Sequence, residues 1–129
     1  MISELSVPLI LASSSTSRAS ILKAAGLAFT AQPARLDETA LIESLLASGA
    51  RPREIADALA EAKTLKVAAS APPEAIVIGA DQLLVCEGRI LEKPAGRAEA
   101  EQHLAFLSGK RHELVGGVAA ARGGRIVWR

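Results

Sequence analysis

A run of hydroxyl side chains near the N-terminus is the first feature that could do chemistry. Five consecutive residues, Ser13 to Ser17, carry hydroxyl groups, and Arg18 follows at once. The run lies where an apolar stretch, residues 7–12, gives way to a helical pattern. A helix N-terminus offers free N–H groups and a positive dipole that bind phosphate, whereas an arginine there opposes the dipole unless an anion is near. The run therefore predicts an anion-binding loop, or else a capping cluster beside a solvated arginine. It contains neither of the glycine-rich phosphate motifs, GxxxxGK[ST] or GxGxxG.

Carboxylates after apolar stretches form the second group. Asp81 follows the buried-strand pattern of residues 75–80, and we expect it at the mouth of that strand. A carboxylate there can act as a general base toward water or hold Mg²⁺, although it can also simply form a turn. Asp37 and Glu38 follow another predicted strand, where helix capping by Asp37 or Thr39 is the alternative.

The remaining candidates give weaker signals. Lys63 and Lys93 could neutralise phosphate, although single lysines are usually solvated. His103 and His112 have no third ligand, so we expect no zinc site. Cys86 is the single cysteine, which excludes an intrachain disulfide and favours a small buried residue.

The elements that must position these side chains alternate along the chain. The patterns predict the order β-α-β-α-α-β-β-α-β-β, which indicates an α/β fold with a mixed sheet. Predicted helices cover residues 17–26, 36–50, 52–70 and 97–109. Predicted strands cover 7–12, 27–34 and 75–80, followed by hairpins over 82–94, turning at Glu87-Gly88, and over 111–129, turning at Gly123-Gly124.

Composition limits the classes of protein. The 129 residues suffice for one domain, and 15 basic against 14 acidic side chains give no case for a nucleic-acid partner. No window approaches the ~20 apolar residues of a membrane span. The N-terminal 15 residues lack the basic region of an export signal. We therefore expect a cytoplasmic protein.

The motifs taken in order resemble the Maf family of nucleoside triphosphate pyrophosphatases. The stretches LILASSSTSRASILKAAGLAF, LDET, EAK, VIGADQLLV, GRILEKP and LSGKRHE carry the resemblance. It implies an α/β fold in two lobes around a cleft, with a mixed twisted sheet flanked by helices. It also implies Mg²⁺- or Mn²⁺-dependent hydrolysis of a nucleoside triphosphate to monophosphate and pyrophosphate, as house-cleaning of the nucleotide pool, and a homodimer. Family members continue beyond residue 129, so residues 1–129 are expected to form the N-terminal part of a longer domain with an incomplete second lobe.

The resemblance assigns roles to individual residues. Asp81 matches the aspartate regarded as the catalytic base, and Glu38 matches an acidic residue that would hold the metal with Asp81. The residues that would bind phosphate are Ser13, Ser15, Arg18, Lys63 and Lys93.

Two positions bear on base preference. Ser17 replaces an arginine or an aromatic residue, depending on the branch of the family, and Gln82 resembles the branch similar to 7-methyl-GTP hydrolases. Base preference therefore stays open, with a lean toward a 7-methylguanine-type base. The alternatives are a non-catalytic nucleotide-binding or septum-regulating protein on the same scaffold, or an unrelated α/β domain. Convergence of the candidate residues on one cleft would separate the pyrophosphatase and the non-catalytic protein on the same scaffold from the unrelated α/β domain.

Overall fold

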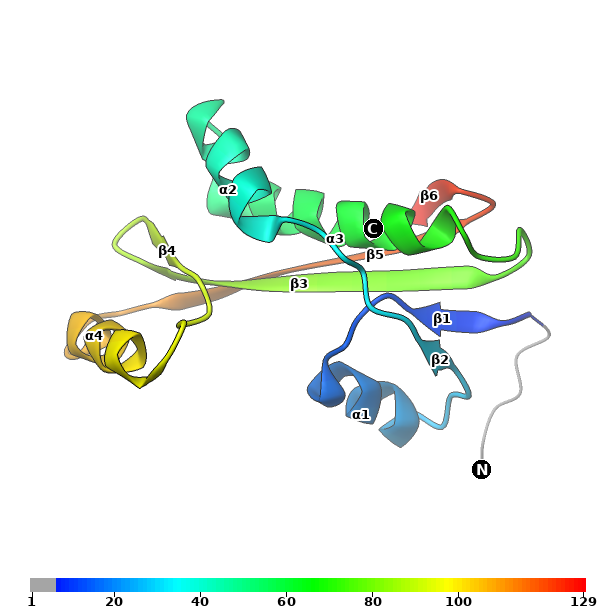
Figure 1. Ribbon diagram of the computed structural model, residues 1–129, viewed down its shortest axis with the longest axis horizontal. Coiled ribbons are helices and arrows are strands. Elements are labelled where there is room, and N and C mark those ends of the chain that lie inside the picture. The colour runs from blue at the N-terminus through cyan, green and yellow to red at the C-terminus, as the bar shows by residue number, and fades with distance from the viewer. Residues whose placement is uncertain (1–6) are drawn as a thin grey trace.

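The order of helices and strands is the predicted one (Figure 1). The protein is described from a computed structural model, and the described residues are 7–129. The strands are β1 (Leu9–Leu11), β2 (Thr30–Ala31), β3 (Ile76–Cys86), β4 (Arg89–Leu91), β5 (Glu113–Arg122) and β6 (Arg125–Trp128). The helices are α1 (Thr16–Ala24), α2 (Glu38–Ala47), α3 (Pro52–Ala68) and α4 (Arg97–Leu107).

The strands form one mixed sheet, as predicted. Its order is β2-β1-β3-β5-β6, and β4 pairs with β3 outside this path. β1 is parallel to β2 and β3, whereas β3, β4, β5 and β6 pair antiparallel. Helix α3 runs along one face of the sheet, and α1 and α4 lie on the opposite side, beside β1 and beside the β3–β4 hairpin (Figure 1). The sheet is therefore mixed and flanked by helices.

Both predicted hairpins are present. Glu87 and Gly88 join β3 to β4 with φ angles of 50° and 74°, and Gly123 and Gly124 join β5 to β6 with 61° and 76°. Two successive positive φ angles give the tight turn that matches strand twist, which explains the glycines.

The strand that carries Asp81 is longer than predicted. The sequence pattern ends this strand at Ala80, but β3 continues to Cys86 because β5 pairs with it from Ile76 to Val85. Asp81 therefore lies in the middle of a strand and not at its mouth. The expectation of a free strand end at this position is wrong.

One other prediction needs correction. The strand predicted over residues 27–34 shrinks to the two residues of β2. In the predicted helix α1, no residue is buried and Ile21 is 67% exposed. In short, alanine-rich segments, apolar residues can follow a helical or strand pattern without being buried in the folded protein.

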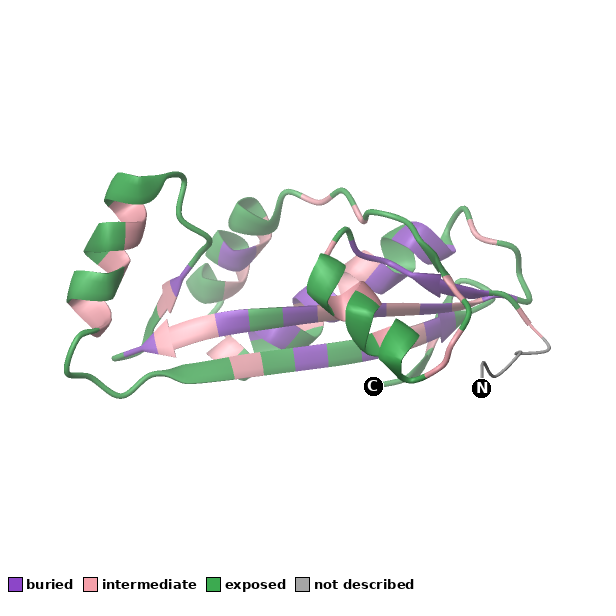
Figure 2. Cartoon of the chain, turned by 90° about the horizontal axis from the view of Figure 1, so that it is seen from below, coloured by how far each residue is buried: buried purple, intermediate pink, exposed green. Residues whose placement is uncertain are grey.

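Alternation along β3 decides which side chains meet α3. Val77 and Leu83 pack against buried residues of α3, in the clusters that contain Val67 and Leu59. Successive side chains of a strand point to opposite faces, so Asp81, two residues before Leu83, also points toward α3. The purple and green bands along the strands in Figure 2 show this alternation of buried and exposed residues.

Two glycines let α3 approach the sheet closely. A Cβ atom at Gly117 would lie 2.7 Å from the carbonyl oxygen of Ala56, and one at Gly79 would overlap Thr64 Oγ1. Backbone atoms cannot move aside as a flexible side chain can. The helix is therefore held at a distance that only glycine permits.

We expect Gly117→Ala to lower the free energy of unfolding by about 2 kcal/mol, the usual cost of overpacking a core. Gly116→Ala is the matched control, because a Cβ atom there would meet only the Asp81 carbonyl oxygen at 3.7 Å. Urea denaturation of both variants measures the difference. Equal stability of the two variants would contradict the close approach of α3.

In the part of the chain that the structure describes, no helix has the length and apolar character needed to cross a membrane. The sequence-based prediction that no export signal is present also involves residues 1–6, which lie outside the described residues.

Candidate active site

The serine loop connects β1 to α1 and is held by its own hydroxyl groups. Ser15 is the N-cap of α1, and its side chain accepts a hydrogen bond from the Arg18 backbone N–H at 3.2 Å. Ser13 is 7% exposed, and its Oγ accepts from the Ser15 N–H at 3.0 Å and from Arg18 Nη1 at 3.4 Å. The capping interpretation is thus confirmed for Ser15. The same contacts fix the Arg18 guanidinium beside the loop, where an anion could bind.

Lys63 joins the two predicted metal-binding carboxylates. It projects from α3, and its Nζ lies 2.7 Å from Glu38 Oε1 and 2.8 Å from Asp81 Oδ1. The side chains of Lys63 and Asp81 are 12% and 7% exposed, whereas that of Glu38 is 46% exposed. Because Lys63 and Asp81 are largely removed from water, the attraction between their charges is screened less than that of a surface pair.

Glu38 is positioned by the start of α2. Asp37 is the N-cap of that helix and accepts from the Ala40 N–H at 3.0 Å. The predicted capping role of Asp37 is therefore confirmed. Glu38 lies in the first turn, where its charge also interacts favourably with the helix dipole.

Asp81 has an unusual electrostatic environment. Burial raises the pKa of its carboxyl group above the usual value, while the hydrogen bond and positive charge of Lys63 act in the opposite direction. The negative charge of Glu38 also raises this pKa, and Arg18 lowers it. Asp81 Oδ2 is buried without a hydrogen-bond partner among the described residues. Buried oxygens without a partner are costly, and such groups concentrate at functional sites.

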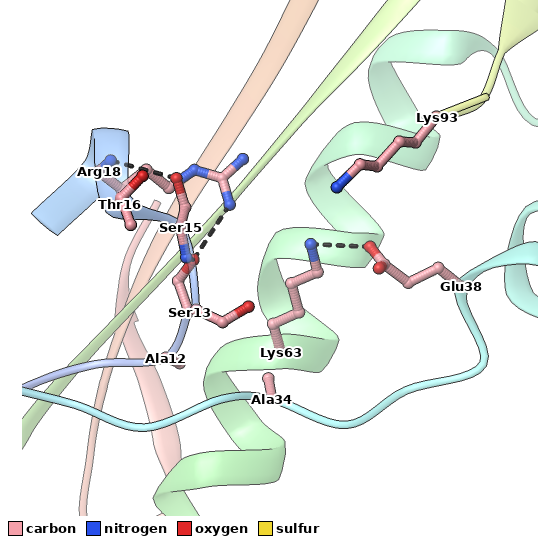
Figure 3. Close-up of a pocket in the computed structure, with 10 residues that line it drawn as sticks. Ala12, Ser13, Ser15, Thr16, Arg18, Ala34, Glu38, Lys63 and Lys93 are labelled. Carbon is pink, nitrogen blue, oxygen red and sulfur yellow. Dashed lines mark hydrogen bonds and ion pairs between the residues drawn. The ribbon is translucent and has the colours of Figure 1, made fainter. Parts of the chain in front are cut away.

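These residues surround one cavity of about 520 Å³. Figure 3 shows Arg18, Lys63 and Lys93 extending toward the same space from α1, α3 and the segment between β4 and α4. The residues that line this cavity are Ala12, Ser13, Ser14, Ser15, Thr16, Arg18, Ala34, Glu38, Lys63 and Lys93. All five predicted phosphate-binding residues are among them. Ser14 and Thr16 belong to the hydroxyl run but were not singled out by the resemblance.

A second cavity of about 320 Å³ adjoins the first and shares Glu38 and Lys93 with it. Asp81 lines this second cavity together with Gln82. The fold therefore brings to two adjoining cavities all seven residues predicted to act in catalysis, phosphate binding or metal binding: Ser13, Ser15, Arg18, Glu38, Lys63, Asp81 and Lys93. The two residues predicted to set base specificity are not brought together, because Gln82 lines the second cavity and Ser17 lines neither.

The two carboxylates provide part of a metal-binding site. Within residues 7–129, no group of three or more histidine, cysteine, aspartate or glutamate side chains is placed to hold a metal ion. Glu38 and Asp81 nevertheless offer hard oxygen ligands, and Asp81 Oδ2 has no other partner. Mg²⁺ is usually held by one or two carboxylates together with phosphate oxygens. The residues present therefore fit a divalent cation that binds together with a phosphate ligand.

Comparison with known proteins places the chain in a family. The family model described as Maf-like protein matches residues 8–128. A protein of Sphingopyxis alaskensis named nucleoside triphosphate pyrophosphatase is 51% identical over 122 residues, which cover 94% of this chain and 61% of that protein. A protein of the same name from Caulobacter vibrioides is 47% identical, with 95% of this chain and 60% of that protein covered.

A third relative differs in name. A protein of Rhizobium meliloti named 7-methyl-GTP pyrophosphatase is 46% identical, covering 94% of this chain and 60% of that protein. The chain thus spans about three fifths of the length of the curated relatives it matches. Since the family model covers nearly all of the chain, the protein belongs to the Maf family.

Proposed function

We propose that this protein hydrolyses a nucleoside triphosphate between the α- and β-phosphates, giving a nucleoside monophosphate and pyrophosphate. The observation that carries the proposal is the placement of a buried carboxylate, Asp81, beside a cavity lined by three cationic side chains. The names of the relatives from Sphingopyxis alaskensis and Caulobacter vibrioides support the same reaction.

The cationic groups neutralise the charge of the substrate. Cleavage of a phosphoanhydride depends mainly on positioning and on stabilising charge on the phosphate oxygens. Arg18 and the serine loop would bind the leaving pyrophosphate, because the guanidinium and the hydroxyl groups can donate to several oxygens at once. Lys93 faces the same cavity and adds positive charge from the opposite wall.

Asp81 would act as the general base. A water oxygen attacks the α-phosphorus, the bond from the α-phosphorus to the bridging oxygen breaks, and pyrophosphate leaves with that oxygen. The proton of the water passes to the Asp81 carboxylate. Burial raises the pKa of this group, which makes the carboxylate a stronger base than one in water.

Glu38 and Asp81, with substrate phosphate oxygens, would hold Mg²⁺ or Mn²⁺, which supplies further positive charge to the reacting phosphate when bound. Lys63 contacts both carboxylates and holds them close together. Lys63 therefore keeps the Glu38 and Asp81 carboxylates near each other, as joint binding of one divalent cation would require.

Pyrophosphate release from a panel of nucleotides tests the proposal. The panel contains dTTP, UTP, CTP, GTP and 7-methyl-GTP with Mg²⁺ or Mn²⁺, and the Sphingopyxis alaskensis relative serves as the reference for the assay. We expect release from at least one nucleotide. Nucleotide binding without release would instead favour a non-catalytic, nucleotide-binding role for this chain.

A further inference from the structure

The second cavity has a chemical character different from the first. Its walls include four apolar side chains, and its polar residues other than Lys93 offer a side-chain amide, a hydroxyl group and three carboxylates. The residues lining it are Glu38, Thr39, Ile42, Leu59, Asp81, Gln82, Leu83, Leu91, Glu92 and Lys93. Apolar walls with a few polar groups are typical of sites that bind a flat organic ring.

The position of this cavity fixes which end of a substrate it can take. The argument rests on the proposed function. The serine loop and Arg18 line only the first cavity, whereas Asp81 lines only the second, and Glu38 and Lys93 line both. If the β- and γ-phosphates bind at the serine loop and the α-phosphate lies next to Asp81, the nucleoside must extend into the second cavity. A volume of about 320 Å³ suits a nucleobase.

Glu92 is the charged residue of this cavity that the proposed reaction does not use. It directly precedes Lys93 and follows β4, and its Oε1 accepts a hydrogen bond from Thr39 Oγ1 at 2.8 Å. Thr39 lies in the first turn of α2, and its β-branched side chain has restricted rotamers. Both residues are exposed and line the second cavity, so the contact orients the Glu92 carboxylate at the solvent-facing side of that cavity. An ionised carboxylate has about four acceptor sites, of which Thr39 occupies one.

A carboxylate can only accept hydrogen bonds, so it selects for bases that present donors. Guanine presents two neighbouring donors, N1–H and the N2 amino group, which match the two oxygens of a carboxylate. Adenine and cytosine present one amino group beside an acceptor, and uracil presents one N–H between two carbonyl oxygens. Methylation at N7 gives guanine a positive charge, which a carboxylate also favours.

We propose that Glu92, held by Thr39, is a specificity-determining residue that binds the N1–H and N2 amino edge of a guanine-type base in the second cavity. Neither the family model nor the names of the relatives assign this residue. The proposal agrees with the presence of Gln82, the predicted specificity residue, in the same cavity.

Equilibrium binding of uncleavable nucleotides tests this role without requiring turnover. The probes are the α,β-methylene analogues of GTP, ITP and UTP with Mg²⁺, measured by calorimetry. Inosine lacks only the N2 amino group, so the GTP-to-ITP affinity ratio isolates that contact. We expect the guanosine analogue to bind about tenfold more tightly than the inosine analogue, which is at the lower end of the effect of a well-aligned bidentate contact. In Glu92→Gln the preference should disappear, while affinity for the inosine analogue stays within about twofold.

Two further variants complete the test. Thr39→Val removes the anchoring hydroxyl group at nearly constant volume and should reduce the preference part of the way. Glu87→Gln is the matched control, because Glu87 lies on the same hairpin, pairs with Lys110 and does not line the second cavity. It should leave the ratio unchanged.

The failures of the two proposals differ. If all three analogues bind but the guanosine preference is absent, or survives in Glu92→Gln, the role of Glu92 is wrong and the proposed hydrolysis is unaffected. If none of the analogues binds, both the role of Glu92 and the proposed function are overturned.

Discussion

Replacing Asp81 by asparagine is expected to lower pyrophosphate release by about 10³-fold, because general-base catalysis contributes 10²- to 10⁴-fold and an amide cannot accept the proton. Asparagine keeps the shape of the side chain and can still accept from Lys63 Nζ, which lies 2.8 Å from Asp81 Oδ1. The loss should therefore appear mainly in kcat. A steady-state assay on the best nucleotide of the panel measures it.

The same variant should be at least as stable as the parent chain at pH 7. Burial raises the pKa of the Asp81 carboxyl group in the folded state, so folding disfavours the ionised form. The contribution of this group to stability is therefore present at acid pH and lost as the pH rises through its folded-state pKa. Asparagine avoids that loss, so any gain in Tm should shrink as the pH falls from the raised folded-state pKa toward about 4, the pKa of an unfolded aspartate, and should vanish below it.

Asp57→Asn is the control, since Asp57 is an exposed aspartate of the same helix, α3, as Lys63 and lines neither cavity. Its pyrophosphate release and its Tm should match those of the parent chain. Retention of release in Asp81→Asn would exclude Asp81 as the base. A large fall in its Tm would show that the ionised carboxylate stabilises the fold.

Replacing Lys63 by methionine is expected to lower the free energy of unfolding at pH 7 by about 3 kcal/mol, the usual effect of removing one partner from a buried ion pair. The change leaves Asp81 and Glu38 close together without the cation that joins them. Methionine preserves much of the length and apolar surface of the lysine stem. The effect thus reports on charge more than on volume.

The pH dependence gives a second readout for this variant. The hydrogen bond and charge of Lys63 lower the pKa of Asp81, so their removal should raise it further. The ascending limb of the pH–rate profile should then move to higher pH, because the base must be ionised to work. The stability difference should narrow at acid pH, where the Asp81 carboxylate becomes protonated.

Lys66→Met on the exposed side of the same helix is the matched control and should change stability by less than about 0.5 kcal/mol. Denaturation from pH 3 to pH 8 follows all three chains. A difference between Lys63→Met and the parent that does not vary with pH would mean that packing, and not charge, explains the role of Lys63.

Local signals in the sequence were enough to identify most elements. Hydrophobic period and turn residues predicted the order of the elements, the mixed sheet and both hairpins, because these features depend on neighbouring residues. The strand that contains Asp81 was predicted too short, since its extension to Cys86 depends on pairing with β5, whose sequence lies far along the chain.

The sequence by itself determined the chemical groups of the candidate site, because the serine run, the carboxylates and the lysines can be read from residue types and motifs. Only the tertiary structure decided how they meet. Alternation along β3 places Asp81 and Leu83 on the same face of the strand. The packing of α3 against that face decides that it is buried and brings Lys63 into contact with Asp81. Likewise, Thr39 and Glu92 are 53 residues apart in sequence. No local pattern encodes such a contact, because it depends on where α2 lies relative to the end of β4 in the sheet.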